Sequence, residues 1–204
     1  KTHLEALGHE VYVFCPAKSI RPSKHAQLLC EDDHIIRFPS FKSGFFDDFD
    51  MTLFFPPRVL SQIKELELDV IHIFTPSQIG MIGVRAAHKL DIPFIMQHST
   101  DIYEFSENYP NVLPGVLAIV SILLPFSVKM GGQDIKEILK MYRPRRHAVQ
   151  WNKDIIERGV NVVYSKAAAV IALSRKSQYQ LESWQDEEYT YPITLLPNGV
   201  DAIA

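Results

Sequence analysis

The sequence lacks the patterns that most often reveal a metal site or a phosphate-binding loop. Its two cysteines, Cys15 and Cys30, have neither the spacing of a zinc site nor the number that a disulfide framework requires. The chain also contains no HExxH pair, no GxGxxG segment and no GxxxxGKS/T segment. We therefore expect no bound metal, and the low cysteine content favours a reducing, cytoplasmic compartment.

A large excess of charge is also missing. The net charge is -3 and the isoelectric point is near 6.2, so the chain has no general attraction for nucleic acid, and no nucleic-acid partner is expected. Basic residues gather locally in a turn that begins at Arg143 and ends at Arg146. This turn could meet anionic lipid head groups, which would place the protein at the inner face of a membrane, or it could be a solvated surface turn.

No hydrophobic run is long enough to cross a membrane. The apolar run that begins at Gly115 and ends at Val128 has fourteen residues, whereas a spanning helix needs about 20. Three interpretations stay open for this run within the unusually long segment 108–150. It could be a buried core helix, a helix that lines a groove for a greasy substrate or lies on a bilayer, or a partner interface.

The two ends of the sequence look incomplete. Residues 1–7 resemble the last turns of a helix, closed by Gly8, and no strand precedes them. The sequence stops soon after a turn at residues 197–199. We therefore expect a fragment, and the lack of a targeting signal carries no information.

Alternating strand and helix patterns predict one α/β domain, and 47% hydrophobic residues suffice for a substantial core. Residues 69–74 and 92–96 are short apolar runs, and residues 79–90 carry apolar side chains at helical spacing, which together predict a βαβ unit. The mixture of phenylalanine and aspartate in residues 40–52 suggests an irregular loop. Similar patterns predict strands at 10–15, 35–38, 168–173 and 193–196, and helices at 59–66, 135–142, 155–163 and 175–184. The hydroxyl of Ser174 can cap the last of these helices.

Polar residues follow both strands of the βαβ unit. They are Thr75, Pro76 and Ser77 after the first strand, and His98, Ser99, Thr100 and Asp101 after the second. Because parallel strands end at the same edge of a sheet, we expect these residues to face one crevice.

His98 is the leading candidate for chemistry in that crevice. Its imidazole could donate to a developing anion or to a sugar hydroxyl, or it could simply be satisfied by backbone at a strand end. His72 lies inside the first strand, where a core or supporting role is favoured. Glu104 and Glu107 could serve an acceptor hydroxyl as partner or base, although a solvated loop face is the favoured interpretation.

Six segments in order resemble the retaining glycosyltransferases of family 4, also called group 1, which have the GT-B fold. Residues 69–76 (DVIHIFTP) resemble the family's DVIHxHTP strand, and residues 97–100 (QHST) resemble the YHT that follows its next strand. The other four are LGHEV at 7–11, IPFI at 92–95, VIALS at 170–174 and LPNGVD at 196–201.

This resemblance implies a Rossmann-like parallel sheet with helices on both faces, forming the amino-terminal half of a GT-B fold without its first strand or second domain. Residues 1–197 would be the acceptor-side domain. Residues 198–204, with Asn198 and Gly199, would begin the interdomain linker. The missing domain would bind most of the nucleotide-sugar donor, so this fragment by itself should be inactive.

The resemblance also implies residue roles. His98 would be the catalytic residue beside the transferred sugar, with no metal and no cofactor, and the acceptor would be a sugar or a lipid. The segment containing Tyr103 and Glu104 looks most like enzymes that glycosylate diacylglycerol. The implied acceptor-binding residues are Thr75, Pro76, Ser77, Ser99, Thr100, Asp101, Tyr103 and Glu104.

The sequence differs from the family pattern at one position, and two alternative functions stay open. Phe74 stands where many members have a second histidine. A sugar-nucleotide epimerase of the same fold would use the crevice without an acceptor. A non-catalytic binding module would use the apolar run to dock a partner.

Overall fold

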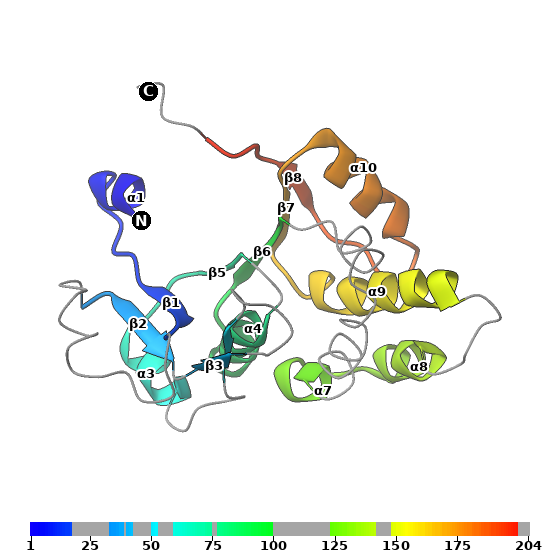
Figure 1. Cartoon of the computed structure of the whole chain (residues 1–204), viewed down its shortest axis with the longest axis horizontal. Coiled ribbons are helices and arrows are strands. Elements are labelled where there is room, and N and C mark those ends of the chain that lie inside the picture. The colour runs from blue at the N-terminus through cyan, green and yellow to red at the C-terminus, as the bar shows by residue number, and fades with distance from the viewer. Residues whose placement is uncertain are drawn as a thin grey trace. The chain divides into compact units, whose positions relative to one another are not determined.

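A computed structural model describes residues 1–17, 33–38, 40–42, 50–52, 59–74, 77–99, 123–141 and 148–199 (Figure 1). The chain divides into two compact units, residues 1–62 and 63–204. The expectation of one domain over residues 1–197 followed by a linker stays a prediction.

The first unit contains two small sheets. Helix α1 (Thr2–Ala6) ends before Gly8, whose φ of 89° confirms the left-handed residue expected there. Strands β1 (Val13–Pro16) and β2 (Ile35–Phe38) pair in parallel. Strands β3 (Ser40–Lys42) and β4 (Asp50–Thr52) pair antiparallel, so the expectation of an irregular loop is wrong for residues 40–42 and 50–52, while residues 43–49 lie outside the described residues. Each segment has only three residues, too few for its polar–apolar–polar order to predict a strand, and the pairing of the two segments lets both become strands. Helix α3 (Val59–Glu65) follows β4 in the chain and runs past residue 62.

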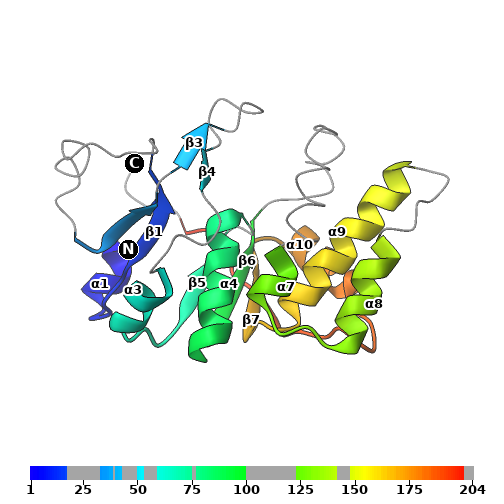
Figure 2. The same ribbon diagram turned by 90° about the horizontal axis from the view of Figure 1, so that it is seen from below.

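The second unit is built on a parallel sheet in the order β5-β6-β7-β8, which confirms the α/β fold class (Figure 2). Its strands are β5 (Ile71–Ile73), β6 (Phe94–His98), β7 (Ala169–Ala172) and β8 (Ile193–Leu195). Ile73 is in register with Met96, and Met96 with Val170, so these three buried side chains share one face and form the centre of the core.

Five helices of the second unit are described. They are α4 (Gln78–Leu90), α7 (Leu124–Ser127), α8 (Gly132–Met141), α9 (Ala148–Tyr164) and α10 (Arg175–Trp184). Serine caps begin two of them, since Ser77 Oγ accepts from Gly80 N at 3.5 Å and Ser174 Oγ accepts from Ser177 N at 3.1 Å. The cap predicted at Ser174 is therefore confirmed.

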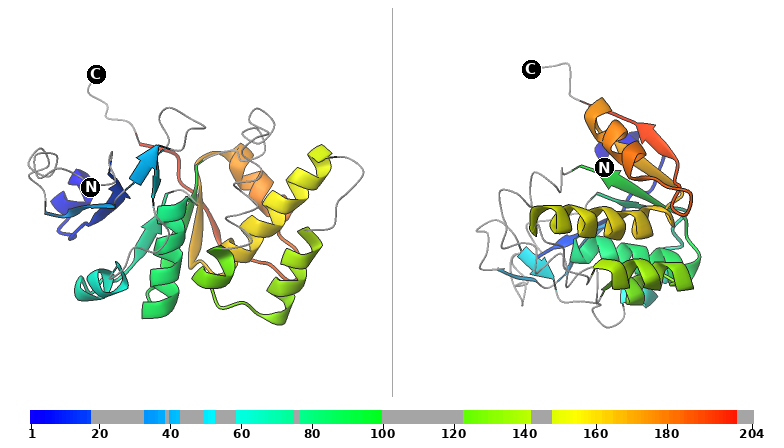
Figure 3. Two further views of the ribbon diagram at one scale, coloured as in Figure 1. Left: turned by 60° about the horizontal axis from the view of Figure 1, so that its bottom comes forward. Right: turned by 90° about the vertical axis from the view of Figure 1, so that its right-hand side faces the viewer.

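Helices α4, α9 and α10 lie on the same side of this sheet (Figures 1 and 3). A Cβ at Gly83 of α4 would meet Ile73 at 3.4 Å, which explains the close contact between this helix and β5. Tyr164 of α9 and Trp184 of α10 both contact His98, which is on the same face of β6 as Met96. These helices therefore cover the face that carries Ile73, Met96 and His98.

Helix α8 buries carboxylates and exposes aliphatic side chains. Asp134 and Glu137 are 3% and 4% exposed, whereas Ile135 and Leu139 are 51% and 61% exposed. The Asp134 carboxylate accepts hydrogen bonds from Gly131 N and the Tyr189 hydroxyl, both at 2.9 Å, and lies 3.2 Å from Lys166 Nζ. Polar contacts, rather than an apolar stripe, therefore attach α8 to the unit.

Glu137 belongs to the same polar attachment. Its carboxylate forms ion pairs with Lys140 of the same helix and with Arg158 of α9. A buried carboxylate is tolerated only when it is paired and hydrogen-bonded, and both acids of α8 meet that condition.

We predict that the second unit loses stability in acid because Asp134 becomes protonated. Burial alone would raise its pKa, but the hydrogen bonds from Gly131 and Tyr189, with Lys166, outweigh burial and lower the pKa of this carboxyl. The resulting stabilisation is complete above the ordinary aspartate pKa of about 3.9 and is lost as pH falls through the lower folded value. Urea unfolding midpoints should therefore fall more steeply with acidification in the wild type than in Asp134→Asn. Parallel curves for the two proteins would contradict this prediction.

Candidate functional site

The carboxyl ends of β5 and β6 lie together at one edge of the sheet. The strands are parallel, with Ile73 in register with Met96, and Ser99 Oγ donates a hydrogen bond to the Phe74 carbonyl at 2.9 Å. The expected meeting of these two strand ends is therefore confirmed for Phe74 and Ser99.

The other predicted residues fall in three groups. Ser77 is half-buried and caps α4. Asn198 and Gly199 are exposed residues after β8, and their assignment to a linker stays a prediction. Six predicted acceptor residues lie outside the described residues, and their roles also stay predictions: Thr75, Pro76, Thr100, Asp101, Tyr103 and Glu104.

His98 is the last residue of β6 and is 3% exposed. Its Nδ1 lies 3.1 Å from the Tyr164 hydroxyl. Two aromatic rings lie nearly perpendicular to the imidazole and restrain it. The centroid of the imidazole lies 5.7 Å from that of the Trp184 ring and 6.0 Å from that of the Tyr164 ring. A hydrogen bond and two ring contacts therefore fix the orientation of His98.

The two rings that contact His98 belong to a larger buried aromatic cluster. The Tyr191 ring meets the Tyr164 ring at 5.6 Å, and its hydroxyl donates to Asn161 Oδ1 at 3.0 Å. Asn161 Nδ2 donates in turn to the carbonyl of Trp184. Burial, and to a smaller extent the neighbouring Tyr191, raises the pKa of Tyr164, so its hydroxyl keeps its proton at neutral pH.

Sequence reasoning did not identify this cluster. Tyr164 ends α9 and lies 66 residues after His98, so no local spacing links the two. The available signal was an aromatic residue at the end of each of two helices, Tyr164 and Trp184. Such residues usually indicate core packing, and only the fold shows what they contact.

His72 and Phe74 are on the face of β5 opposite to Ile73. Their rings are stacked with centroids 4.3 Å apart, and Phe74 is 60% exposed. Partial burial lowers the pKa of His72, and a hydrogen bond with Gln97 opposes this effect. The His72 side chain is exposed, so the expectation that it belongs to the core is wrong. Its alternative role, supporting the residues of the site, stays a prediction.

Two further properties can be stated for the described part of the chain. Its histidine, cysteine, aspartate and glutamate side chains form no group of three that could hold a metal ion. Among its helices, none combines the length and the apolar character that crossing a bilayer demands.

Comparison with known proteins identifies the family to which this chain belongs. The family model described as Glycosyltransferase Family 4 matches residues 1–203. No solved structure shows significant similarity to the chain.

Curated relatives match about half of the chain. An alpha-monoglucosyldiacylglycerol synthase of Acholeplasma laidlawii is 34% identical over 117 residues, which are 55% of this chain and 27% of that protein. A GDP-mannose-dependent alpha-mannosyltransferase of Mycolicibacterium smegmatis is 31% identical over 52% of the chain and 28% of its own length. An alpha-monoglucosyldiacylglycerol synthase of Streptococcus pneumoniae is 31% identical over 52% of the chain and 22% of its own length. The matched region thus covers about a quarter of each relative. Because the family model spans nearly every residue, the chain belongs to glycosyltransferase family 4.

Proposed function

We propose that the full-length protein transfers a sugar from a nucleotide-sugar donor to an acceptor, and that this chain forms the acceptor side of its crevice. The observation that carries the proposal is the edge where β5 and β6 end together, with His98 held at the last position of β6. Ligands of open α/β sheets bind at the carboxyl ends of the strands. Family membership supplies the reaction class.

In this proposal His98 orients the transferred sugar. An imidazole N–H can donate to a sugar hydroxyl, and its fixed ring means that little ordering remains when the substrate binds. Ser99, Thr100 and Asp101 follow His98 directly and would contact the acceptor together with Thr75 and Ser77. No residue of this set needs to bind a metal for that role.

The proposed activity can be tested by following a labelled sugar. We expect the full-length protein to move label from a nucleotide sugar, for example GDP-mannose or UDP-glucose, into a diacylglycerol-containing lipid extract. Label that stays in the nucleotide pool as an isomerised sugar would instead support an epimerase. Label that remains unchanged with every donor and acceptor would contradict both reactions.

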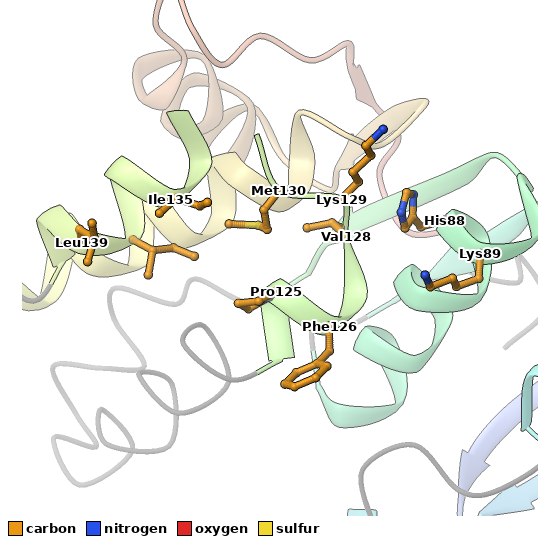
Figure 4. A pocket seen from close by; sticks show the side chains of 10 residues that line it. His88, Lys89, Pro125, Phe126, Val128, Lys129, Met130, Ile135 and Leu139 are labelled. Atoms are coloured by element: carbon orange, nitrogen blue, oxygen red, sulfur yellow. The ribbon is translucent and has the colours of Figure 1, made fainter. Parts of the chain in front are cut away.

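The acceptor class that we propose is a lipid, with the enzyme held at a membrane surface. The support for contact with a membrane surface is an apolar groove of about 510 Å³ between the end of α4, helix α7 and helix α8 (Figure 4). Exposed Phe126, Ile135 and Leu139 contribute to its walls. Monomeric proteins rarely leave such side chains together in water without a partner.

The charge of this groove favours an anionic surface. Lys89 and Lys129 are exposed lining residues, and none of the ten lining residues carries a carboxylate. Basic residues beside apolar side chains are the pattern of proteins that lie on anionic bilayers. The apolar run of the sequence thus contributes Pro125, Phe126 and Val128 to the groove, while its first eight residues lie outside the described residues.

The groove would hold the enzyme at the membrane rather than admit the acceptor. Helix α4 begins at Gln78, beside the strand ends, and has 13 residues, so it is about 20 Å long. The groove lies near His88 and Lys89, at the opposite end of this helix. Loss of groove contacts should therefore weaken vesicle binding without changing turnover of a detergent-dispersed acceptor.

Vesicle flotation tests this surface. The full-length protein should float with phosphatidylcholine vesicles that contain phosphatidylglycerol, and less with phosphatidylcholine alone. The Lys89→Gln/Lys129→Gln double variant should bind roughly tenfold or more weakly, since each basic residue near an anionic surface contributes about 1 kcal/mol. Phe126→Ser/Leu139→Ser should also lose binding. A matched control is Lys176→Gln/Tyr179→Ser on exposed positions of α10, and equal losses in all variants would rule out the groove.

A further inference from the structure

The hydrogen bond between His98 and Tyr164 joins two buried polar groups. The Tyr164 hydroxyl lies 3.1 Å from Nδ1 of His98, and the two residues are 1% and 3% exposed. Within the described part of the chain, His98 is the one hydrogen-bond partner of this hydroxyl. The position of the ring proton therefore decides whether the Tyr164 hydroxyl has an acceptor for its own proton.

Two arrangements of that proton can be compared. If Nδ1 carried a proton and donated it to Tyr164, the hydroxyl proton would need a second acceptor. Leaving such a donor unused in a buried site is unfavourable. If the hydroxyl donates to an unprotonated Nδ1, the hydroxyl proton is used in that bond and the ring proton lies on Nε2. Burial raises the pKa of Tyr164, so its hydroxyl retains the proton that this arrangement requires.

We infer that Tyr164 is a positioning residue that holds His98 as a neutral imidazole with its proton on Nε2. The hydrogen bond made by one ring nitrogen determines which tautomer a histidine adopts. In this tautomer Nε2 is a donor, as a contact with a sugar hydroxyl requires. The inference rests on the proposed sugar-orienting role of His98, but the tautomer itself exists without substrate.

The surrounding aromatic cluster supports this positioning role. The Trp184 ring meets the imidazole edge-on at 5.7 Å, so rotation of the imidazole is restricted. Asn161 donates to the Trp184 carbonyl and accepts from Tyr191, which links this tryptophan to the rest of the cluster. A ring held in this way cannot easily exchange its two nitrogens by flipping.

The cluster also provides a matched control. Tyr191 is a second buried tyrosine whose ring contacts Tyr164 at 5.6 Å, but its hydroxyl bonds to Asn161 rather than to His98. Tyr164→Phe and Tyr191→Phe each delete one buried hydroxyl from the same cluster and keep the ring. A general loss of packing should affect both variants equally, whereas the tautomer of His98 should depend on Tyr164 alone.

The test is nitrogen NMR of the full-length protein labelled with ¹⁵N-histidine, without substrate. His98 signals are assigned by their loss in His98→Asn. We expect the proton on Nε2 in the wild type and in Tyr191→Phe, and a mixture of tautomers in Tyr164→Phe. A proton on Nδ1 in the wild type, or an unchanged tautomer in Tyr164→Phe, would overturn the inference.

Kinetics provides the second readout. Tyr164→Phe should lower kcat several-fold with little change in KM, because only the fraction of enzyme with the His98 proton on Nε2 still orients the sugar correctly. Tyr191→Phe should keep wild-type kcat. An unchanged kcat in Tyr164→Phe would overturn the positioning role, whereas a failure of sugar-label transfer by the wild type would count against the proposed function itself.

Discussion

Replacing His98 by alanine should lower kcat of the full-length enzyme by about a hundredfold or more while the protein still folds. A positioned donor that acts only in the transition state contributes about 10² to 10³ in rate. The free energy of unfolding should fall by about 1–3 kcal/mol, because the change mainly leaves the Tyr164 hydroxyl without its acceptor. Initial rates and denaturant unfolding of the same preparations measure the two effects.

Met96→Ala separates catalysis from packing. Met96 is fully buried two residues earlier on β6 and faces the same side of the sheet as His98. Its truncation should cost about 2–5 kcal/mol of stability but should leave kcat unchanged where the protein is folded. Wild-type turnover in His98→Ala would remove this histidine from the site, and similar kcat losses in both variants would indicate a structural effect.

Asp134→Ala should destabilise the second unit by about 3 kcal/mol. The change removes the acceptor of Gly131 N and of the buried Tyr189 hydroxyl, and it leaves Lys166 without its carboxylate partner. Breaking a buried ion pair by removing one partner usually costs about 3–5 kcal/mol, and the partly exposed Lys166 can turn to water, which favours the lower value. Urea unfolding monitored by circular dichroism measures the loss.

Glu182→Ala is the control for this substitution. Glu182 is an exposed carboxylate on α10 that accepts a hydrogen bond from Gln178, so its loss should change stability by less than about 0.5 kcal/mol. An equally small loss in Asp134→Ala would show that the polar attachment of α8 does not support the fold.

Local signals predicted most of the second unit. Residues 175–184 and the capping Ser174 were predicted at their observed bounds, because a capping hydroxyl and helical spacing are both short-range features. The βαβ unit followed from two β-branched runs around a helical pattern, and parallel pairing of its strands follows from the geometry of the crossover.

Long-range packing accounts for what the sequence did not predict. The helical pattern of α8 predicted the helix, but amphipathic helices usually bury their apolar residues, whereas α8 buries Asp134 and Glu137. Their partners Tyr189 and Arg158 come from segments beyond this helix, so spacing within α8 could not reveal them. The contact between His98 and Tyr164 depends in the same way on the three-dimensional fold.

In the candidate site, too, one feature could be predicted from the sequence and another could not. The meeting of the β5 and β6 ends could be predicted from crossover geometry, and the structure confirms it through Ser99 and Phe74. The aromatic restraint on His98 could not be predicted, because β6, α9 and α10 each contribute one of its members.

A structure of the full-length protein with a non-transferable nucleotide-sugar analogue tests the central claim most directly. The account predicts that the sugar lies at the carboxyl edge of β5 and β6, with Nε2 of His98 about 3 Å from a sugar hydroxyl. A sugar bound elsewhere, with His98 still enclosed by Tyr164 and Trp184 and out of its reach, would contradict it.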